Sequence, residues 1–223
     1  MIFCRLDLYF FPILDIYTPI DRTILGYKEL FSPIRRFSMK KAAVIHDLSG
    51  FGKCSLTAAI PVLSALGVQC CPVATAVLTG QTGYPCYHCT DLTAMLPDYI
   101  DAWGKNNAHF DAIYSGFLTG AKQISQVLDF IRYFREEHTL LLVDPVMGDD
   151  GNAYPFFTPG LLNGMKELTL EADVITPNLT EACLLADIPE DALLHCRTNT
   201  DLLKLAEDVA QRLQKKVPHP QDV

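Results

Sequence analysis

Short apolar runs alternate with long amphipathic segments from residue 42 onward. The apolar runs are solid, without the in–out alternation of a strand that has one wet face, and the segments between them are long enough to be helices. Strands joined by long crossovers pair in parallel, and parallel sheets are covered on both faces. The sequence therefore predicts an α/β fold with a doubly wound, mainly parallel sheet and helices on both faces.

The pattern also gives approximate bounds for each element. The expected strands span residues 42–46, 68–78, 110–116, 139–144 and 172–178. The expected helices span residues 55–67, 91–103, 121–138, 158–170, 179–187 and 200–216, and each of the first two contains an internal proline. Residues 39–216 are long enough to bury one core, so we expect them to form one domain.

The two ends of the chain fall outside this pattern. Residues 1–38 are rich in large apolar residues, but charges and prolines interrupt them, so no membrane span is expected. They also lack the basic leader and the small-residue cleavage site of a secretory signal. We expect Met39 to be the natural start and residues 1–38 to be an upstream extension; the alternative is an arm packed on a partner. Residues 217–223 are expected to be a tail outside the domain.

Composition excludes several classes of function. The net charge is −8 and no block of Lys or Arg stands out, so neither a nucleic-acid nor an anionic-membrane surface is expected. Of the eight cysteines, Cys54 and Cys183 lie in segments that read as helical, and Cys70 and Cys71 lie in a strand-like run, which indicates reduced thiols in a cytoplasmic protein. Cys86 and Cys89 form a CxxC, but no second pair at zinc spacing accompanies them, so we assign no metal to the cysteines.

Five loops after the predicted strands carry glycine or proline together with small polar or acidic residues. In open α/β sheets the ligand crevice lies beyond the carboxyl ends of the strands. The loops expected there span residues 46–55, 79–84, 115–120, 144–151 and 176–181. They predict one polar pocket. The first loop, HDLSGFGKCS, matches neither a dinucleotide nor a P-loop motif, and His46 is more typical of a hydrogen-bonded histidine at a strand end than of a catalytic one.

Acidic residues cluster where the strand at residues 139–144 ends. Asp149 and Asp150 follow Asp144 closely, and Glu181 is expected at the same edge. Mg²⁺ takes one or two carboxylates together with water and phosphate oxygens, so a shared ion would relieve the repulsion. The alternatives need no ligand: Asp144 caps a turn, Asp150 lies in a solvated turn, and Asn178 with Glu181 caps a helix.

A resemblance to a known family rests on five segments that occur in this order: AAVIHDLSGFGKCSLTAAIPVLSALGVQ, TAVLTGQTGY, DAIYSGF, VDPVMGDDG and VITPNLTEA. Together they resemble the pyridoxal/pyridoxamine kinases of the ribokinase-like superfamily, from about Lys40 to about Gln214. DPVMGD and TPNxxE are typical of its vitamin-kinase branch, which includes hydroxymethylpyrimidine kinases. The resemblance implies ATP- and Mg²⁺-dependent phosphorylation of the 5'-hydroxymethyl group of pyridoxine-type vitamers, and a homodimer for the full-length family.

The resemblance also implies which residues form the site. The implied vitamer-binding residues are Asp47, Ala76, Thr82 and Phe117. The implied ATP- and phosphate-binding residues are Asp144, Asp149, Thr176, Asn178 and Glu181, of which Asp144, Asp149 and Glu181 are the implied Mg²⁺ ligands, directly or through water. Two positions depart from the family pattern. Asp47 replaces a small polar residue, and Gly80-Gln81 replaces Asn-His.

The family's late GTGD-like loop, which carries the aspartate base and the phosphate-binding amides, is not found in this sequence. We therefore expect the base to lie beyond Val223, the domain to lack the last third of the fold, and the chain as given to have little or no kinase activity. The alternatives are a hydroxymethylpyrimidine kinase, a non-catalytic vitamer- or nucleotide-binding pseudoenzyme, and a poorly folded gene remnant.

Overall fold

The computed structural model describes residues 39–216. The chain divides into two units between Ser38 and Met39, and all described residues belong to the second. The predictions for residues 1–38 and 217–223 lie outside the described residues. Within residues 39–216, no helix combines the length and the apolar character that crossing a membrane requires.

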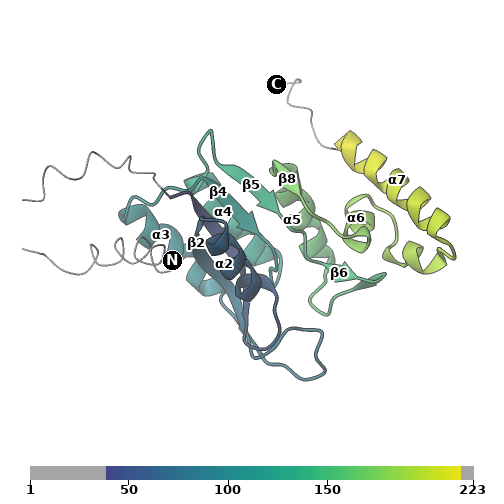
Figure 1. Cartoon of the computed structure of the whole chain (residues 1–223), viewed down its shortest axis with the longest axis horizontal. Coiled ribbons are helices and arrows are strands. Elements are labelled where there is room, and N and C mark those ends of the chain that lie inside the picture. The colour runs from purple at the N-terminus through teal and green to yellow at the C-terminus, as the bar shows by residue number, and fades with distance from the viewer. Residues whose placement is uncertain (1–38, 217–223) are drawn as a thin grey trace, which may run out of the picture. The chain divides into compact units, whose positions relative to one another are not determined.

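A six-stranded sheet forms the centre of the described unit, in the order β3-β2-β1-β4-β5-β8 (Figure 1). Its strands are β1 (Lys41–Ser49), β2 (Gln69–Leu78), β3 (Cys89–Asp91), β4 (Ala112–Ser115), β5 (Leu140–Val143) and β8 (Val174–Ile175). All neighbours pair in parallel except β2 and β3, which are antiparallel. The predicted mainly parallel α/β sheet is confirmed, although β8 is shorter than expected.

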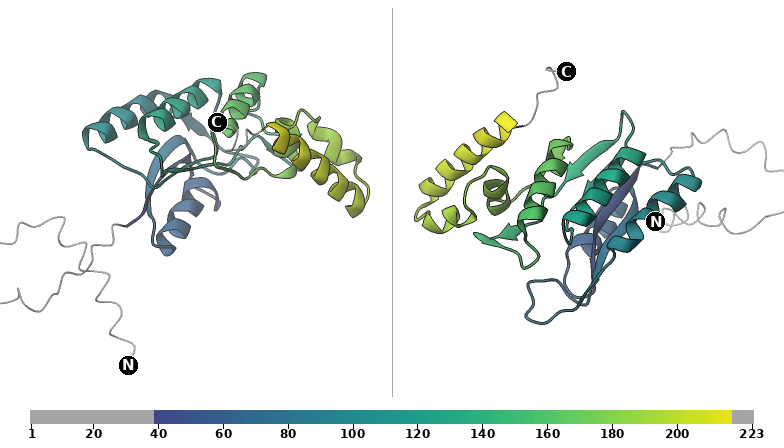
Figure 2. Two further views of the ribbon diagram at one scale, coloured as in Figure 1. Left: turned by 90° about the horizontal axis from the view of Figure 1, so that it is seen from above. Right: turned by 180° about the vertical axis from the view of Figure 1, so that it is seen from behind.

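Helices cover the two faces of the sheet unequally (Figure 2). One face carries α3 (Leu96–Lys105), α4 (Ala121–Phe134) and α5 (Pro159–Leu170), and the other carries α2 (Ser55–Ala65). The main core lies on the three-helix face, where Ile45, Ile113 and Leu141 are completely buried. On the opposite face α2 packs on the β1 half of the sheet through Leu56. Leu140, farther along that face, is 45% exposed.

The helix expected at residues 91–103 begins later than predicted. Residue 91 ends β3, and a 3₁₀ turn, η1 (Thr93–Met95), precedes α3. Pro97 lies in the first turn of α3, where a backbone N–H has no partner within the helix. Pro97 was expected inside this helix and instead lies at its start, whereas Pro61 lies inside α2 as expected.

The last part of the described chain forms a smaller layer of its own. It contains α6 (Leu179–Leu185), the 3₁₀ helix η2 (Glu190–His195) and α7 (Asn199–Lys216), drawn in green to yellow in Figure 1. Buried Cys183 and Val209 belong to its apolar cluster. The amphipathic helix predicted at residues 200–216 is thus confirmed.

A two-stranded hairpin, β6 (Gly148–Asp149) and β7 (Asn152–Ala153), follows β5 and was not predicted. Asp150 (φ +48°) and Gly151 (φ +75°) occupy its two turn positions. A two-residue hairpin with positive φ at both positions is a type I′ turn, for which Asp-Gly is a preferred pair. Asp150 is exposed, so its interpretation as part of a solvated turn is confirmed.

Candidate functional site

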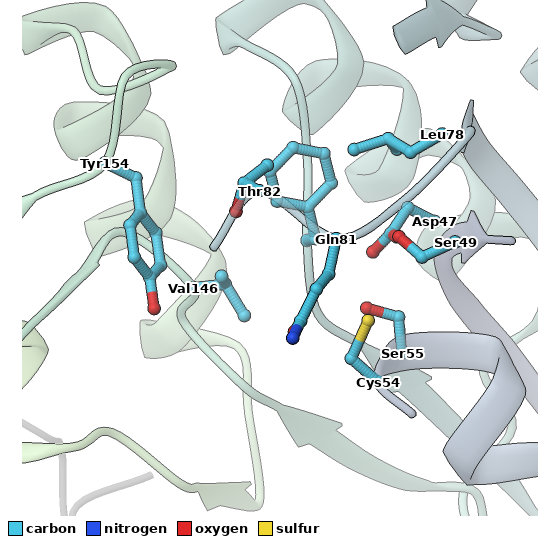
Figure 3. Close-up of a pocket in the computed structure, with 10 residues that line it drawn as sticks. Asp47, Ser49, Cys54, Ser55, Leu78, Gln81, Thr82, Val146 and Tyr154 are labelled. Carbon is cyan, nitrogen blue, oxygen red and sulfur yellow. The ribbon is translucent and has the colours of Figure 1, made fainter. Parts of the chain in front are cut away.

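A cavity of about 140 Å³ opens at the carboxyl edge of the sheet (Figure 3). Its lining comes mainly from four of the five loops that were expected to converge there. The lining residues are Asp47, Ser49, Cys54, Ser55, Leu78, Gln81, Thr82, Phe117, Val146 and Tyr154. The predicted polar pocket is therefore present. We call it the edge pocket.

Asp47 and Ser49 approach the edge pocket from the end of β1, where the register between β1 and β2 shifts between His46 and Leu48. Irregularities of this kind re-aim side chains next to functional sites. Asp47 is only 4% exposed, and its carboxylate accepts a hydrogen bond of 2.8 Å from the Ser49 hydroxyl. The two oxygen-bearing side chains lie together at one end of the pocket, and Tyr154 lies at the other (Figure 3).

Two loops form one rim of the edge pocket. The backbone N–H of Gln81 donates to the Phe51 carbonyl at 2.9 Å, and that of Gly50 donates to Leu78 at 2.8 Å. The Phe51 and Tyr84 rings are in contact, with their centroids 4.9 Å apart. The segment in which Gly80-Gln81 departs from the family pattern is therefore tied to the first loop and contributes Gln81 to the lining.

His46 lies beside this site but differs from the hydrogen-bonded histidine that was predicted. It is 3% exposed, and within the described part of the chain neither ring nitrogen has a hydrogen-bond partner. Its ring packs on Tyr114 and so close to Gly116 that a Cβ there would lie 1.7 Å from it. Burial lowers the pKa of His46 to about 4. The ring is therefore neutral at physiological pH.

Asp144 is half-buried directly after β5. Its backbone N–H donates to the Ser115 carbonyl at 2.8 Å, which extends the β4–β5 pairing. Burial raises the pKa of Asp144 to about 6, although a side-chain hydrogen bond with the exposed Thr176 acts in the opposite direction. A cation near this half-buried carboxyl would favour its charged form and lower its pKa.

Glu181 is 3% exposed, and backbone N–H groups from two segments bind its carboxylate. Its two carboxylate oxygens accept from the N–H groups of Asn178 (2.8 Å) and Met147 (3.2 Å). In return, the Asn178 side chain accepts from the Glu181 N–H at 3.0 Å and donates to the Gly148 carbonyl at 2.8 Å. The predicted helix cap is confirmed, and it also ties α6 to the loop after β5. Burial raises the pKa of Glu181 to about 7, and the Asp144 charge adds to the rise.

Three of the predicted acidic residues raise the pKa of Tyr154, which lies at one end of the edge pocket. Burial raises the pKa of Tyr154, and the charges of Asp149, Glu181 and Asp144 raise it further. Asp149 itself is exposed, and one of its oxygens accepts from the backbone N–H of Asp150 at 2.9 Å. Oxygen donors of this type suit Mg²⁺. Nevertheless, within residues 39–216 no group of three or more His, Cys, Asp or Glu side chains is arranged to hold a metal ion directly.

Of the predicted vitamer-binding residues, Asp47, Thr82 and Phe117 line the edge pocket. Ala76 is fully buried and packs with Phe117 in the apolar layer behind the lining. The lining residues that sequence reasoning did not single out as ligand-binding are Ser49, Cys54, Ser55, Leu78, Gln81, Val146 and Tyr154. All but Tyr154 lie in or directly beside loops that the parallel topology had already placed at this edge. Nothing local marks Tyr154, because the β6–β7 hairpin positions it.

Comparisons with known proteins agree with this architecture. The sequence profile of the phosphomethylpyrimidine kinase family matches residues 52–217. The pyridoxine/pyridoxal/pyridoxamine kinase of Bordetella avium (strain 197N) is 34% identical over 143 residues, which is 60% of this chain and 47% of that protein. A crystal structure from Bacteroides thetaiotaomicron VPI-5482, in a form with pyridoxal, is 44% identical with a TM-score of 0.70, covering 78% of this chain and 60% of that one. Pyridoxal kinase from Lactobacillus plantarum is 31% identical with a TM-score of 0.69, covering 81% and 61%.

The chain spans about half or less of the length of the curated relatives that it matches, and about 60% of the solved chains. The profile match nevertheless covers well over half of this chain. It includes the loops at residues 79–84, 115–120, 144–151 and 176–181, and the end of the first loop from Gly52 onward. It confirms the resemblance to the vitamin-kinase branch of the ribokinase-like superfamily. The chain belongs to the phosphomethylpyrimidine kinase family.

Proposed function

We propose that this chain provides the vitamer-binding pocket, and part of the ATP-phosphate site, of a kinase that phosphorylates the 5'-hydroxymethyl group of pyridoxal, pyridoxamine or pyridoxine. The observation that carries the proposal is the edge pocket itself. It brings Asp47, Thr82 and Phe117 together at the carboxyl edge of the sheet, in a chain that is 44% identical to a protein crystallised with pyridoxal. The B. avium relative is named as a kinase of all three vitamers.

The acids beside the pocket suit the other substrate. Phosphoryl transfer requires alignment of the reactants and neutralisation of the phosphate charges, and little covalent chemistry from the protein. In this proposal Asp144 and Asp149 hold Mg²⁺, which supplies that neutralisation when it is bound with ATP. Both oxygens of Glu181 already accept backbone N–H groups, so its contribution is through water. Thr176 and Asn178 order the same loop.

A second candidate substrate is a hydroxymethylpyrimidine, because the matching family profile is that of phosphomethylpyrimidine kinases. The transferred group and the accepting alcohol are of the same type, and only the ring differs. The expectation that the chain as given has little or no kinase activity stays a prediction.

Calorimetry on the full chain tests the proposal. Pyridoxal, pyridoxamine, pyridoxine and 4-amino-5-hydroxymethyl-2-methylpyrimidine are titrated separately, and Mg-ADP is titrated with and without EDTA. We expect at least one vitamer to bind more tightly than the pyrimidine, and Mg-ADP binding to weaken in EDTA. A coupled assay of ADP release then measures turnover.

A matched pair of tyrosine variants locates the binding. Tyr154→Ala removes an aromatic wall of the edge pocket, so we expect vitamer affinity to fall by about tenfold, or about 1.4 kcal/mol. Tyr133→Ala, at a 60% exposed position on α4, is the control and leaves affinity unchanged. If none of the four ring compounds binds the folded full chain, the proposal is wrong.

A further inference from the structure

A buried polar network holds the wall of the edge pocket that carries Phe117. This residue lies in the loop after β4, residues 116–120, and its ring packs on that of Phe156 with the centroids 5.5 Å apart. The Phe117 carbonyl accepts a hydrogen bond of 2.9 Å from the hydroxyl of Thr75, a completely buried residue of β2. The position of this pocket residue therefore depends on a side chain behind the lining.

Gln123 connects the network to the start of α4. It is 1% exposed, and its side-chain carbonyl accepts from the backbone N–H of Thr119 at 2.8 Å. Its amide nitrogen donates to the Thr75 carbonyl at 2.8 Å and to the Thr93 hydroxyl at 3.1 Å. The loop is thus fixed at two points: Gln123 binds the N–H of Thr119 directly, and Thr75 binds the carbonyl of Phe117.

This arrangement differs from an ordinary helix cap. In a capping box, a glutamine in the first turn accepts from the backbone N–H of the N-cap residue, which in α4 is Gly120. Gln123 accepts from the preceding residue instead, and its amide nitrogen reaches β2 and η1. The hydroxyl of the same Thr119 also donates to Asp91 at the end of β3. The network therefore joins the loop to two neighbouring strands as well as to its own helix.

We propose that Gln123 is a positioning residue of the edge pocket, which fixes the loop after β4 and, through Thr75, the Phe117 wall. Vitamer affinity then depends on a side chain outside the pocket. This inference rests on the function proposed above and adds a residue to it. Its physical basis is preorganisation, because a ligand binds more tightly when the side chains around it are already held in place. Without the Gln123 amide, the N–H of Thr119 loses its acceptor, and the loop has to move to satisfy it.

Calorimetry with pyridoxal, pyridoxamine and pyridoxine on the full chain tests the inference. Gln123→Met keeps the length of the side chain and removes its hydrogen bonds, so we expect the affinity for each vitamer that binds to fall by about tenfold. Gln126→Met is the matched control on the same helix, because the Gln126 side-chain oxygen has no hydrogen-bond partner among the described residues. It should keep the wild-type affinity. Thr75→Val should weaken binding as Gln123→Met does, whereas Thr75→Ser keeps the hydroxyl and should bind like the wild type.

Two measurements separate positioning from a general loss of stability. If Gln123 acts through the Phe117 ring, Gln123→Met should change affinity by no more than about twofold in a Phe117→Leu background. Hydrogen exchange of residues 116–120 in the ligand-free chain should be faster in Gln123→Met than in Gln126→Met. Denaturation midpoints establish that each variant is folded at the temperature of the titration.

The outcomes distinguish this inference from the function on which it rests. If the wild type binds a vitamer and Gln123→Met binds it equally well, Gln123 is not a positioning residue while the vitamer-binding function stands. An equal loss of affinity in both backgrounds, or unchanged hydrogen exchange of residues 116–120, would also overturn the inference alone. If no vitamer binds the wild-type chain, both are wrong.

Discussion

Three residues beside the edge pocket have pKa values that differ from those of exposed groups. Asp144 and Glu181 have raised pKa values, whereas His46 has a lowered one, and burial is the largest cause in all three. Burial favours the neutral form of any titratable group. The residues beside the edge pocket are therefore poised to respond to a cation or to pH.

The raised pKa of Asp144 makes a pH-dependent contribution to stability. A carboxyl group with a higher pKa in the folded state binds more protons there, so its contribution to the free energy of unfolding is present below pH 4 and is lost as the pH rises through about 6. Between pH 4 and pH 7, the free energy of unfolding of Asp144→Asn should therefore rise by about 1 kcal/mol relative to that of the wild type, after allowance for solvent screening. Urea denaturation of both chains at the two pH values measures this. A difference between the chains that does not change with pH would contradict it.

Close packing of Gly116 on His46 gives a second prediction. A Cβ at residue 116 would lie 1.7 Å from the imidazole ring, so Gly116→Ala should lower the free energy of unfolding by about 3 kcal/mol through overpacking. Gly83→Ala, where a Cβ has no neighbour within 4 Å, is the control and should change little. Because His46→Ala empties the space, the double variant should recover most of the loss. If the double variant instead loses as much free energy of unfolding as the two single variants together, this contact is not the cause.

Among the elements, α6 has the clearest link between local structure and the site. Its cap uses Asn178 and Glu181, and the same two side chains hold the backbone of residues 147 and 148 in the loop after β5. The same hydrogen bonds therefore cap the helix and fix the backbone at residues 147 and 148. The β6–β7 hairpin that follows this loop in turn positions Tyr154 at the pocket.

Removing the α6 cap should affect both stability and nucleotide binding. Asn178→Ala deletes a helix cap and a hydrogen bond to Gly148, so we expect a loss of about 2 kcal/mol in the free energy of unfolding and weaker Mg-ADP binding. Thr158→Ala removes the cap of α5, where Oγ1 accepts from the Leu161 N–H at 3.1 Å. It should cost about 1 kcal/mol and leave Mg-ADP binding unchanged. Equal effects of the two variants on binding would argue against a role for Asn178 in the site.

Across the whole described unit, topology explains where the pocket lies. Parallel strands bring the loops after β1, β4 and β5 to one edge, and the segments between them return on the faces of the sheet. The core is deepest under α3, α4 and α5. It fixes the strands whose ends carry Asp47, Phe117 and Asp144, so the polar side chains at the edge are held by a rigid apolar base.

Local pattern was sufficient for most elements and for the position of the pocket. Apolar runs and amphipathic stripes have different periods, so they predicted the strands and helices of the main sheet. Where the local pattern gave a wrong prediction, the cause is also local. Residues 89–91 pair with β2 although the run is too short to read as a strand, and Pro97 starts a helix that was expected to contain it.

The character of the site depends on contacts between residues far apart in the chain. The sequence contains Asp47, His46 and Gly116, but it does not reveal that Asp47 has so few partners, that both His46 nitrogens lack hydrogen bonds within the described residues, or that the ring lies against Gly116. Periodicity reports which face of an element is buried. Burial, charge pairing and pKa depend on which elements meet, and this is settled by the packing of the sheet, its helices and the loops at its edge.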